Sequence, residues 1–480
     1  MESHEKKKIV KNLKWMAFSK IIIYLLSIIT ITLIPRYLGV EGYGQLNFII
    51  SFVSIFSIIG DLGINTLIIR DISKNTKKAK EYYNNLFLFR IIISLLFILV
   101  VFIFALFQKS STIDLIIIYA IGMGFFLLGN FNLSFLISFQ ENKYQAISDA
   151  IQKVTYTLGV ILVIVLNYKL FGIIVANAVA SVVVFVFSFF AIKKFIKIKN
   201  LKLNKKYIKQ KLILASPFIF TCIFWTIYFN IDRIFITYIR GNYATGLYSI
   251  SNTFLGFLLS FIGILSTTFF PVLSNVSNNK LKLKSIVDKY LLLIYLFSAP
   301  ATIGCIYLAP QIITLVFGSQ YLGGTIAFQL VMLFFLLNSV GLVNYYLLIT
   351  NNLEKYSLKI LGVSTGTNLL LNFIFVPWLG IVGAAITTII AEVVIFILSY
   401  KKIRSDIIKI DYFSPLIKPA IASGIMLLGL IFYNYFYPIG VLHNKFDVLI
   451  SIAIGVIIYI STLFITKTIT LKQIKETIKI

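Results

Sequence analysis

The stretch from Arg36 to Lys74 reads RYLGVEGYGQLNFIISFVSIFSIIGDLGINTLIIRDISK, and the rest of the chain is best interpreted outward from it. A glycine-rich turn opens the stretch, a mostly apolar run of about twenty-five residues follows, and a basic segment closes it. A membrane-spanning helix between a tight loop on one side and a charged segment on the other has this pattern. The stretch therefore predicts a span over residues 45–69.

Polar side chains recur along this span at helical spacing. They are Asn47, Ser51, Ser54, Asp61 and Asn65. On an α-helix these positions share one face, while isoleucine and phenylalanine cover the others. A polar stripe on such a helix should face other helices or water rather than lipid.

The composition of the whole chain agrees with a membrane protein. Of its 480 residues, 59% are hydrophobic and only 13% are charged, and the mean hydropathy is +0.94. A soluble domain of this size could not cover so much apolar surface. Apolar runs of about twenty residues recur, which is the length of a spanning helix and about twice that of a barrel strand. The sequence predicts an all-α integral membrane protein.

The net charge of +27 would suggest nucleic acid as a partner if the chain were soluble. Here the lysines cluster between the apolar runs, a distribution that membrane orientation and anionic lipid head groups explain better. We therefore expect membrane lipids, and not nucleic acid, to contact this charge.

About fourteen segments have the length and hydropathy of spanning helices. They are 15–35, 45–69, 86–107, 115–139, 148–167, 172–192, 212–239, 244–270, 287–308, 327–350, 357–376, 379–400, 416–437 and 447–466. With a cytoplasmic N-terminus, most of the 44 lysines and arginines fall on the cytoplasmic side, the final cluster Lys467–Lys479 included. The outside loops then hold only Arg36, Lys109, Lys169, Arg240 and Lys445. This asymmetry predicts an even number of spans and two cytoplasmic termini.

The longest polar linker predicts the domain organisation. Residues 193–211 contain nine lysines and follow the sixth predicted span. They separate an N-terminal six-helix half, 1–192, from a C-terminal six-helix half, 212–400. Residues 401–480 would add two further helices and a basic tail.

An internal match supports the two halves. The segment 36–46 lies against 239–248, and adding 202 takes Gly44 to Gly246 and Asn47 to Ser249. The polar stripe then reappears on the eighth predicted span as Ser249, Thr253, Gly256, Ser260, Gly263 and Thr267. Because six helices per half is an even number, both halves enter the membrane from the same side. This predicts parallel repeats around a central cavity.

Charged and amide side chains inside the spans are the candidates for a functional site, since a charge at a helix centre costs about 2.5–3.5 kcal/mol on insertion scales. Three of them are cations, namely Lys20, Arg90 and Arg233. The acids are Asp61, Asp232 and Glu392, and the amides on polar faces include Asn47, Asn230 and Asn368.

Most of these residues also have a structural alternative. Lys20 and Arg90 could snorkel to the cytoplasmic interface. Asp149 and Lys153 have i, i+4 spacing and could pair with each other. Glu392 could be a buried neutral acid bonded to a neighbour, or a proton site. The small-residue faces of the second and eighth predicted spans could be close-packed interfaces or cavity walls.

Signals of catalysis are weak. The sequence contains no Walker A, GxSxG, HExxH or CxxC motif. The two histidines, His4 and His443, have no metal-ligand company, and the longest outside loop, 309–326, has no charged residue. We therefore predict a transporter rather than an enzyme, with no cofactor and no metal.

Particular motifs resemble a known family. Arg36-x-Leu38-Gly39-x-x-x-Tyr43-Gly44, then Asp61-Leu62-Gly63-Ile64 and Arg70-Asp71, are similar to the opening of the bacterial polysaccharide flippases. These are the Wzx-type O-antigen and exopolysaccharide exporters of the multidrug/oligosaccharidyl-lipid/polysaccharide exporter superfamily. The segment from Asp232-Arg233-x-x-Ile236 to Gly246-x-Tyr248 resembles their seventh and eighth helices. The resemblance extends over essentially the whole chain.

This resemblance implies flipping of an undecaprenyl-diphosphate-linked oligosaccharide across the bacterial cytoplasmic (inner) membrane. A polysaccharide polymerase and the chain-length machinery would be candidate partners. A diphosphate crossing about 30 Å of hydrocarbon needs cations to replace its hydration, and Lys20, Arg90 and Arg233 are available. The candidates for diphosphate and sugar binding are these three with Asn47, Asp61, Asn230 and Asn368; those for ion coupling are Asp61, Asp232 and Glu392.

Two other classes of function remain open. A multidrug exporter coupled to Na⁺ or H⁺ would favour twelve helices, an apolar aromatic cavity and a carboxylate cluster in the first half. A non-transport membrane subunit, or an enzyme, would favour an inserted soluble domain. Fourteen spans, three cations and short connections weigh against both.

Overall fold

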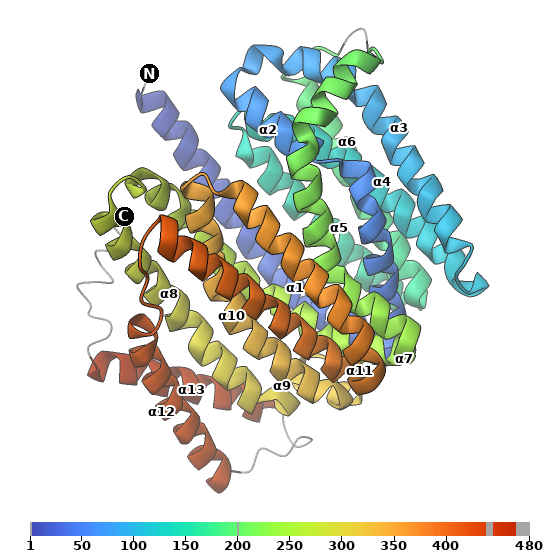
Figure 1. The fold of residues 1–480 in the computed structure, drawn as a ribbon. Helices are drawn as coiled ribbons and strands as arrows, with labels where there is room; N and C mark the ends of the chain where they lie inside the picture. The colour runs from blue at the N-terminus through green and yellow to red at the C-terminus, as the bar shows by residue number, and fades with distance from the viewer. Residues whose placement is uncertain (1, 199–200, 438–444, 467–480) are drawn as a thin grey trace. The chain divides into compact units, whose positions relative to one another are not determined.

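A computed structural model of the chain describes residues 2–198, 201–437 and 445–466 (Figure 1). It consists of two compact units, Met1–Ile234 and Phe235–Ile480. The predicted cluster Lys467–Lys479 and His443 lie outside the described residues. The division between the units lies within one long helix, past the lysine-rich linker, and the halves drawn at that linker stay a prediction.

Eleven helices in the described part of the chain are long and apolar enough to cross a membrane. They are α1 (Glu2–Asp61), α3 (Ala79–Ala105), α4 (Ser110–Ser138), α5 (Asn142–Val165), α6 (Lys169–Lys193), α7 (Lys205–Val276), α8 (Lys280–Tyr307), α10 (Thr325–Thr350), α11 (Glu354–Asp406), α12 (Ser414–Phe436) and α13 (Lys445–Ile465). The shorter elements are α2 (Ile64–Lys74), α9 (Ala309–Val316) and the 3-10 turns η1 (Thr76–Lys78) and η2 (Ser319–Gly324). The prediction of an all-α, multi-pass membrane protein is confirmed.

Three of the long helices contain two predicted spans each, which corrects the expected loops between them. In α1, α7 and α11 the helix is interrupted only at a single glycine with non-helical backbone, Gly39, Gly241 and Gly380 respectively. The hydropathy pattern therefore located the changes of direction, but it overestimated the length of chain that each one uses.

The first two of these glycines support the internal repeat. Gly39 has φ 71° and ψ 177°, and Gly241 has φ 84° and ψ 176°. This combination is open almost only to glycine, because a Cβ would clash with the backbone. Their separation is the 202 residues of the predicted repeat, so the two halves share the same backbone turn at equivalent positions.

In each unit a side chain just before this turn holds the connection after the fifth span of its half. Tyr37 donates from its hydroxyl to the carbonyl of Val163 at 3.2 Å and accepts from the backbone N–H of Lys169 at 2.9 Å. Arg240 donates to the carbonyls of Pro377 and Trp378 at 2.5 and 3.4 Å, beside the break in α11. A similar architectural role is thus filled by different residues, which explains why the repeat is faint in the sequence.

The second predicted span is also broken, at Leu62 and Gly63. The prediction of one continuous helix over 45–69 is therefore wrong. Both residues have positive φ, 48° and 64°. Gly63 is further required because a Cβ there would lie 2.8 Å from the Cβ of Phe218 on α7. In the second half, α7 continues without interruption through the equivalent positions and ends at Val276. The two halves of the repeat therefore differ at the break at Leu62 and Gly63.

The first unit packs around α1. α1 contacts α3, α4, α5 and α6, and α2 contacts α4; these helices are labelled in Figure 1. A hydrophobic cluster joins α2, α3, α4, α6 and the start of α7, and its largest buried members are aromatic. They include Tyr82, Tyr83, Phe87, Phe131 and Phe135. This cluster fixes the broken end of the second span.

The second unit packs around α8 and α10, with α12 and α13 also in contact with α8. Pro300 lies inside α8 and removes the N–H that would bond to the carbonyl of Leu296. The Tyr459 hydroxyl of α13 donates to that carbonyl at 3.0 Å, so a backbone group in the membrane region stays satisfied. The predicted loop 309–326 contains two short elements, α9 and η2, between α8 and α10.

Candidate functional site

The polar face predicted for the second span meets α7 in the first unit at two levels. At one, Arg233 Nη1 donates to Ser51 Oγ at 3.3 Å. At the other, Cys222 Sγ lies 3.9 Å from Asp61 Oδ2. Residue numbers rise along α1 as they fall along α7, so the two segments are antiparallel. The levels are separated by about 15 Å of helix.

The first level brings together residues that the sequence singles out. Ser51 and Asn47 are buried, with 0% and 6% of their surface exposed, while Arg233 and Asn230 are half-buried. The side-chain amides of Asn47 and Asn230 each donate to a carbonyl one turn earlier on their own helix, at 2.9 Å. This level offers a guanidinium and a hydroxyl on an interface between two spanning helices.

The second level is built around an ion pair. Arg90 Nη2 donates to Asp61 Oδ1 at 3.1 Å, and Nη1 donates to the Asp61 backbone carbonyl at 2.9 Å. Arg90 Nη2 also lies 3.3 Å from the carbonyl of Leu127 on α4, and Asn65 donates to Asp61 Oδ1 at 2.7 Å. Arg90 therefore joins α1, α3 and α4 where α1 ends, satisfying a carbonyl that the helix break leaves exposed.

The snorkelling alternative for Arg90 is wrong, because its side chain has no exposed surface, whereas that of Asp61 is 22% exposed. A fully buried guanidinium needs a carboxylate and additional acceptors to offset its desolvation, and it has both here. The sequence contains a signal for this pair that the prediction missed. Asp61 lies near the end of the second predicted span and Arg90 near the start of the third, so opposite charges fall at matching depths.

Lys20 and the polar residues of α5 form a separate group along the first part of α1. Lys20 is exposed and lies close enough to Asp149 to interact with its charge. The expected Asp149–Lys153 pair is wrong. Asp149 accepts from Gln145 at 2.7 Å, and Lys153 crosses to α1 and donates to Thr30 Oγ1 at 2.8 Å.

The remaining candidates on α10 and α11 belong to the second unit and are deeply buried. Asn372 donates to Asn368 Oδ1 at 3.2 Å and accepts from Thr387 at 3.1 Å, which links α11 across its break at Gly380. Glu392 is 1% exposed and packs against Gly341 of α10, where an added Cβ would lie 2.6 Å from its Oε1. Among the candidates on the first unit, Asp232 is 7% exposed.

A further network, not predicted from the sequence, ties α2 and α3 to α7. Asp71 accepts from Arg70 Nε at 2.9 Å and from the Tyr82 hydroxyl at 2.5 Å, and Lys211 Nζ donates to that hydroxyl at 2.5 Å. The Lys211 ammonium also lies 4.1 Å from the centre of the Tyr82 ring, a cation–π contact.

The charges around Asp71 set its protonation. Burial, the largest single influence, raises the pKa of Asp71. The hydrogen bonds from Tyr82 and Arg70, with the charges of Arg70 and Lys211, outweigh burial and leave the pKa below the ordinary value of 3.8. Asp71 therefore stays ionised and holds this network together at neutral pH.

Taken together, the first unit presents binding groups along a spanning helix. Guanidinium, hydroxyl and amide donors at one level suit an anion or a polyol, and the carboxylate of Asp61 marks the other.

Comparison with known proteins agrees with this interpretation. A family model described as "Polysaccharide biosynthesis protein" matches residues 9–277, which is more than half of the chain. A membrane protein in the cps region of Klebsiella pneumoniae is 25% identical over 503 residues, covering 98% of this chain and 97% of that protein. A membrane protein of Methanocaldococcus jannaschii is 24% identical over 404 residues, covering 79% and 93%.

Solved structures share the fold. The lipid II flippase MurJ, in an inward closed conformation, superposes with a TM-score of 0.79 at 18% identity, covering 94% of this chain and 98% of that one. A multidrug resistance MATE family transporter of the MOP superfamily, in an inward-facing conformation, gives 0.65 at 17% identity, covering 80% and 94%. With the family match, these likenesses confirm the resemblance drawn from the sequence. The chain belongs to the polysaccharide biosynthesis protein family and has the fold of MOP superfamily transporters.

Proposed function

We propose that the chain moves an undecaprenyl-diphosphate-linked oligosaccharide, the repeat unit of O-antigen or another surface polysaccharide, to the outer leaflet of a bacterial cytoplasmic membrane. Rocking of its two halves would alternate access to the two leaflets. The family supports the glycan, and the fold shared with a lipid II flippase supports a lipid-linked substrate. The contact of Arg233 with Ser51 is the observation on which the proposal depends, because a guanidinium here meets the polar face of a spanning helix.

The cations have different roles in this proposal. Arg233 binds the diphosphate, since a guanidinium offers paired donors to phosphate oxygens and replaces part of the lost hydration. Lys20, which is exposed on α1, gives a second contact. Arg90 is already bonded to Asp61 and acts through it, by fixing the end of the polar face.

The amides and acids complete the proposal. Asn47, Asn230 and Asn368 serve the sugars, which need many weak donors and acceptors. Asp61, Asp232 and Glu392 are the candidates for coupling to an ion. Burial of Asp232 and Glu392 supports such a role, because intramembrane acids are expensive and are retained for function.

Coupled export of drugs is the second candidate, favoured by the fold shared with MATE family transporters. It differs from glycan flipping in what its loss does to the cell. Loss of a drug exporter raises sensitivity to the compounds it removes and leaves the surface polysaccharide intact.

A gene deletion in the native host tests the proposal. We expect loss of surface polysaccharide and accumulation of the lipid-linked oligosaccharide in the cytoplasmic leaflet. The wild-type gene should restore export and the Arg233→Gln variant should not, although it still inserts in the membrane. Normal polysaccharide with increased drug sensitivity would instead establish the drug exporter.

A further inference from the structure

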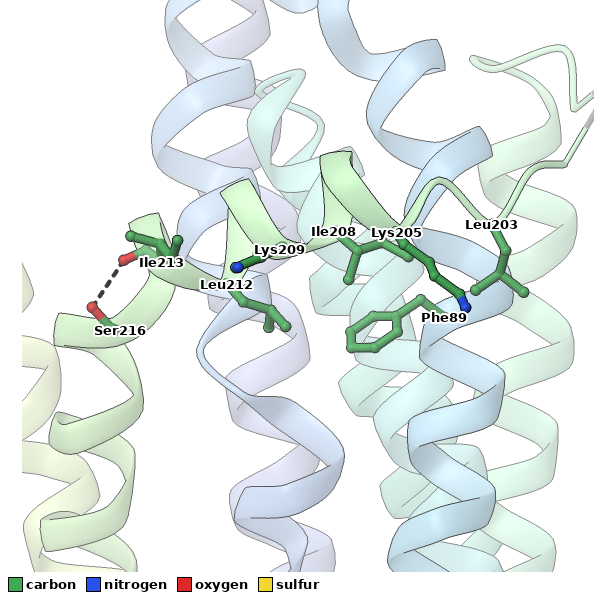
Figure 2. Close-up of a pocket in the computed structure, with 8 residues that line it drawn as sticks. All are labelled: Phe89, Leu203, Lys205, Ile208, Lys209, Leu212, Ile213 and Ser216. Atoms are coloured by element: carbon green, nitrogen blue, oxygen red, sulfur yellow. Dashed lines mark hydrogen bonds between the residues drawn. The ribbon is translucent and has the colours of Figure 1, made fainter.

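A groove in the first unit lies apart from the polar face of α1, between the start of α7 and one turn of α3. Its volume is about 550 Å³. Figure 2 shows the residues that line it: Phe89, Leu203, Lys205, Ile208, Lys209, Leu212, Ile213 and Ser216. The lining is apolar apart from two lysines and one serine, and it contains no acidic residue.

The groove is built on a firmly held segment. Asn204 caps the start of α7 by accepting from the N–H of Tyr207 at 3.1 Å, and the N–H of Lys202 donates to the carbonyl of Asn84 on α3 at 3.0 Å. Ile208 is 6% exposed and belongs to the hydrophobic cluster of this unit. The segment that forms the groove is therefore anchored to α3 and to the hydrophobic cluster.

A bend in α7 gives the groove its shape. Pro217 cannot donate to the carbonyl of Ile213, and the Ser216 hydroxyl bonds to that carbonyl at 2.8 Å instead. Figure 2 shows the first turns of α7 passing in front of neighbouring helices before the chain turns at Ser216. Phe89 lies beneath Ile208 in the same view, so apolar side chains face the helices under this segment.

The segment carries both positive charge and exposed apolar surface. Lys205 and Lys209 are exposed and are one helical turn apart, and Figure 2 shows their side chains extended toward opposite ends of the segment. Both belong to the lysine-rich stretch that the charge distribution puts on the cytoplasmic side, at the level of lipid head groups. Ile213 is 64% exposed, which leaves a large apolar side chain beside these cations.

We propose that this groove binds an anionic glycerophospholipid of the cytoplasmic leaflet. Lys205 and Lys209 attract its anionic head group, and one acyl chain lies along Phe89, Leu212 and Ile213. The absence of acidic residues from the lining favours an anion, and the apolar floor requires a chain. The lining offers few groups to a saccharide, because its one hydroxyl, that of Ser216, already donates to the carbonyl of Ile213.

Native mass spectrometry of the purified full-length chain tests this proposal, by titration with phosphatidylglycerol or with phosphatidylcholine of the same acyl chains. We expect phosphatidylglycerol to bind more tightly. Lys205→Gln and Lys209→Gln should each weaken it about fivefold, the effect of one lysine near an anionic surface. Lys206→Gln is the matched control, since it removes an adjacent exposed charge that does not line the groove, and its affinity should equal the wild type.

Ile213→Ser tests the acyl-chain contact separately. It should weaken both lipids alike and keep the preference for phosphatidylglycerol. All four substitutions are at exposed positions, so thermal unfolding should show that the variants remain folded. Equal binding by wild type, Lys205→Gln and Lys209→Gln would overturn the proposal, as would equal affinity for the two lipids. Displacement of phosphatidylglycerol by an equimolar undecaprenyl-diphosphate-linked saccharide would assign the groove to the transport substrate instead.

Discussion

Arg90 has no exposed surface, and its neighbours determine what Asp61 does in the fold. Moving a guanidinium out of water costs several kcal/mol, which a carboxylate and well-placed acceptors offset. Asp61 supplies its carboxylate and its backbone carbonyl, and Leu127 supplies another carbonyl. Asp61 therefore has a structural role, and any role in transport must be compatible with its bonds to Arg90.

Replacing Asp61 with asparagine should destabilise the protein strongly. The substitution leaves the Arg90 charge buried without a carboxylate, and breaking such a pair from one side costs about 3–5 kcal/mol. The free energy of unfolding in detergent measures this loss. Ser54→Ala, on the same helix face, is the control and should change stability by less than about 0.5 kcal/mol. Removing both charges, as in Asp61→Leu with Arg90→Met, should recover much of the loss; failure to do so would contradict a simple buried pair.

Asp71 predicts a pH dependence of stability. Its pKa is lowered in the folded chain, so the unfolded chain binds the proton more readily. The ion pair and hydrogen bonds of Asp71 therefore contribute fully above the ordinary pKa of 3.8, and this contribution is lost as the pH falls through the lower folded value. Thermal unfolding of wild type and Asp71→Asn should show a stability difference at neutral pH that narrows below about pH 4. A difference independent of pH would show that the charge of Asp71 is not involved.

At the scale of elements, the turns at Gly39 and Gly241 set how each half of the chain reverses direction. Each is one residue long and lies inside an otherwise helical segment. Their ψ angles are nearly equal and both φ angles are positive, although the flanking sequences share few residues. Backbone geometry has thus been retained where side chains have changed.

Alanine at either turn should be destabilising. Gly39→Ala and Gly241→Ala have space for the added methyl group, because no atom lies within 4 Å of the position that a Cβ would take. The loss must therefore come from backbone strain alone, at about 1–3 kcal/mol for each substitution. Gly256→Ala is the matched control within helical α7, where space is also open, and it should stabilise by about 0.5–1 kcal/mol. Similar unfolding temperatures for all three variants would contradict the assigned turn geometry.

Helix existence and location could be predicted from hydropathy and charge, because a bilayer requires long apolar segments and penalises charges between them. The break at Leu62 and Gly63 could not, since the signal is a clash with Phe218, more than 150 residues away in the sequence. Arg233 was singled out from the sequence as a cation inside a span, but its contact with Ser51 depends on the antiparallel placement of α1 and α7. The sequence shows which residues inside the spans are polar, but it does not show which of them pair across distant helices.

At the scale of the whole molecule, transport requires that polar groups be available to a substrate along a spanning helix. In the first unit Arg233 and Ser51 lie at one level and Asp61 at another, about 15 Å along the helix, and the proposed function assigns these groups to the substrate. A fold shared by flippases and drug exporters leaves the substrate open. The chemistry of these residues, rather than the fold, must therefore decide it.

Reconstituted flipping tests this account most directly. Proteoliposomes containing the purified chain and a fluorescent undecaprenyl-diphosphate-linked saccharide allow the translocated fraction to be measured with a membrane-impermeant quencher. We predict that wild type and the control Lys206→Gln transfer the substrate at the same rate. Arg233→Gln should transfer it at least about tenfold more slowly than wild type, since a hydrogen bond to a charged group contributes about 1.5–3 kcal/mol. Arg233→Lys should recover part of the rate. Equal transfer by wild type and Arg233→Gln, or no transfer by the wild type, would contradict it.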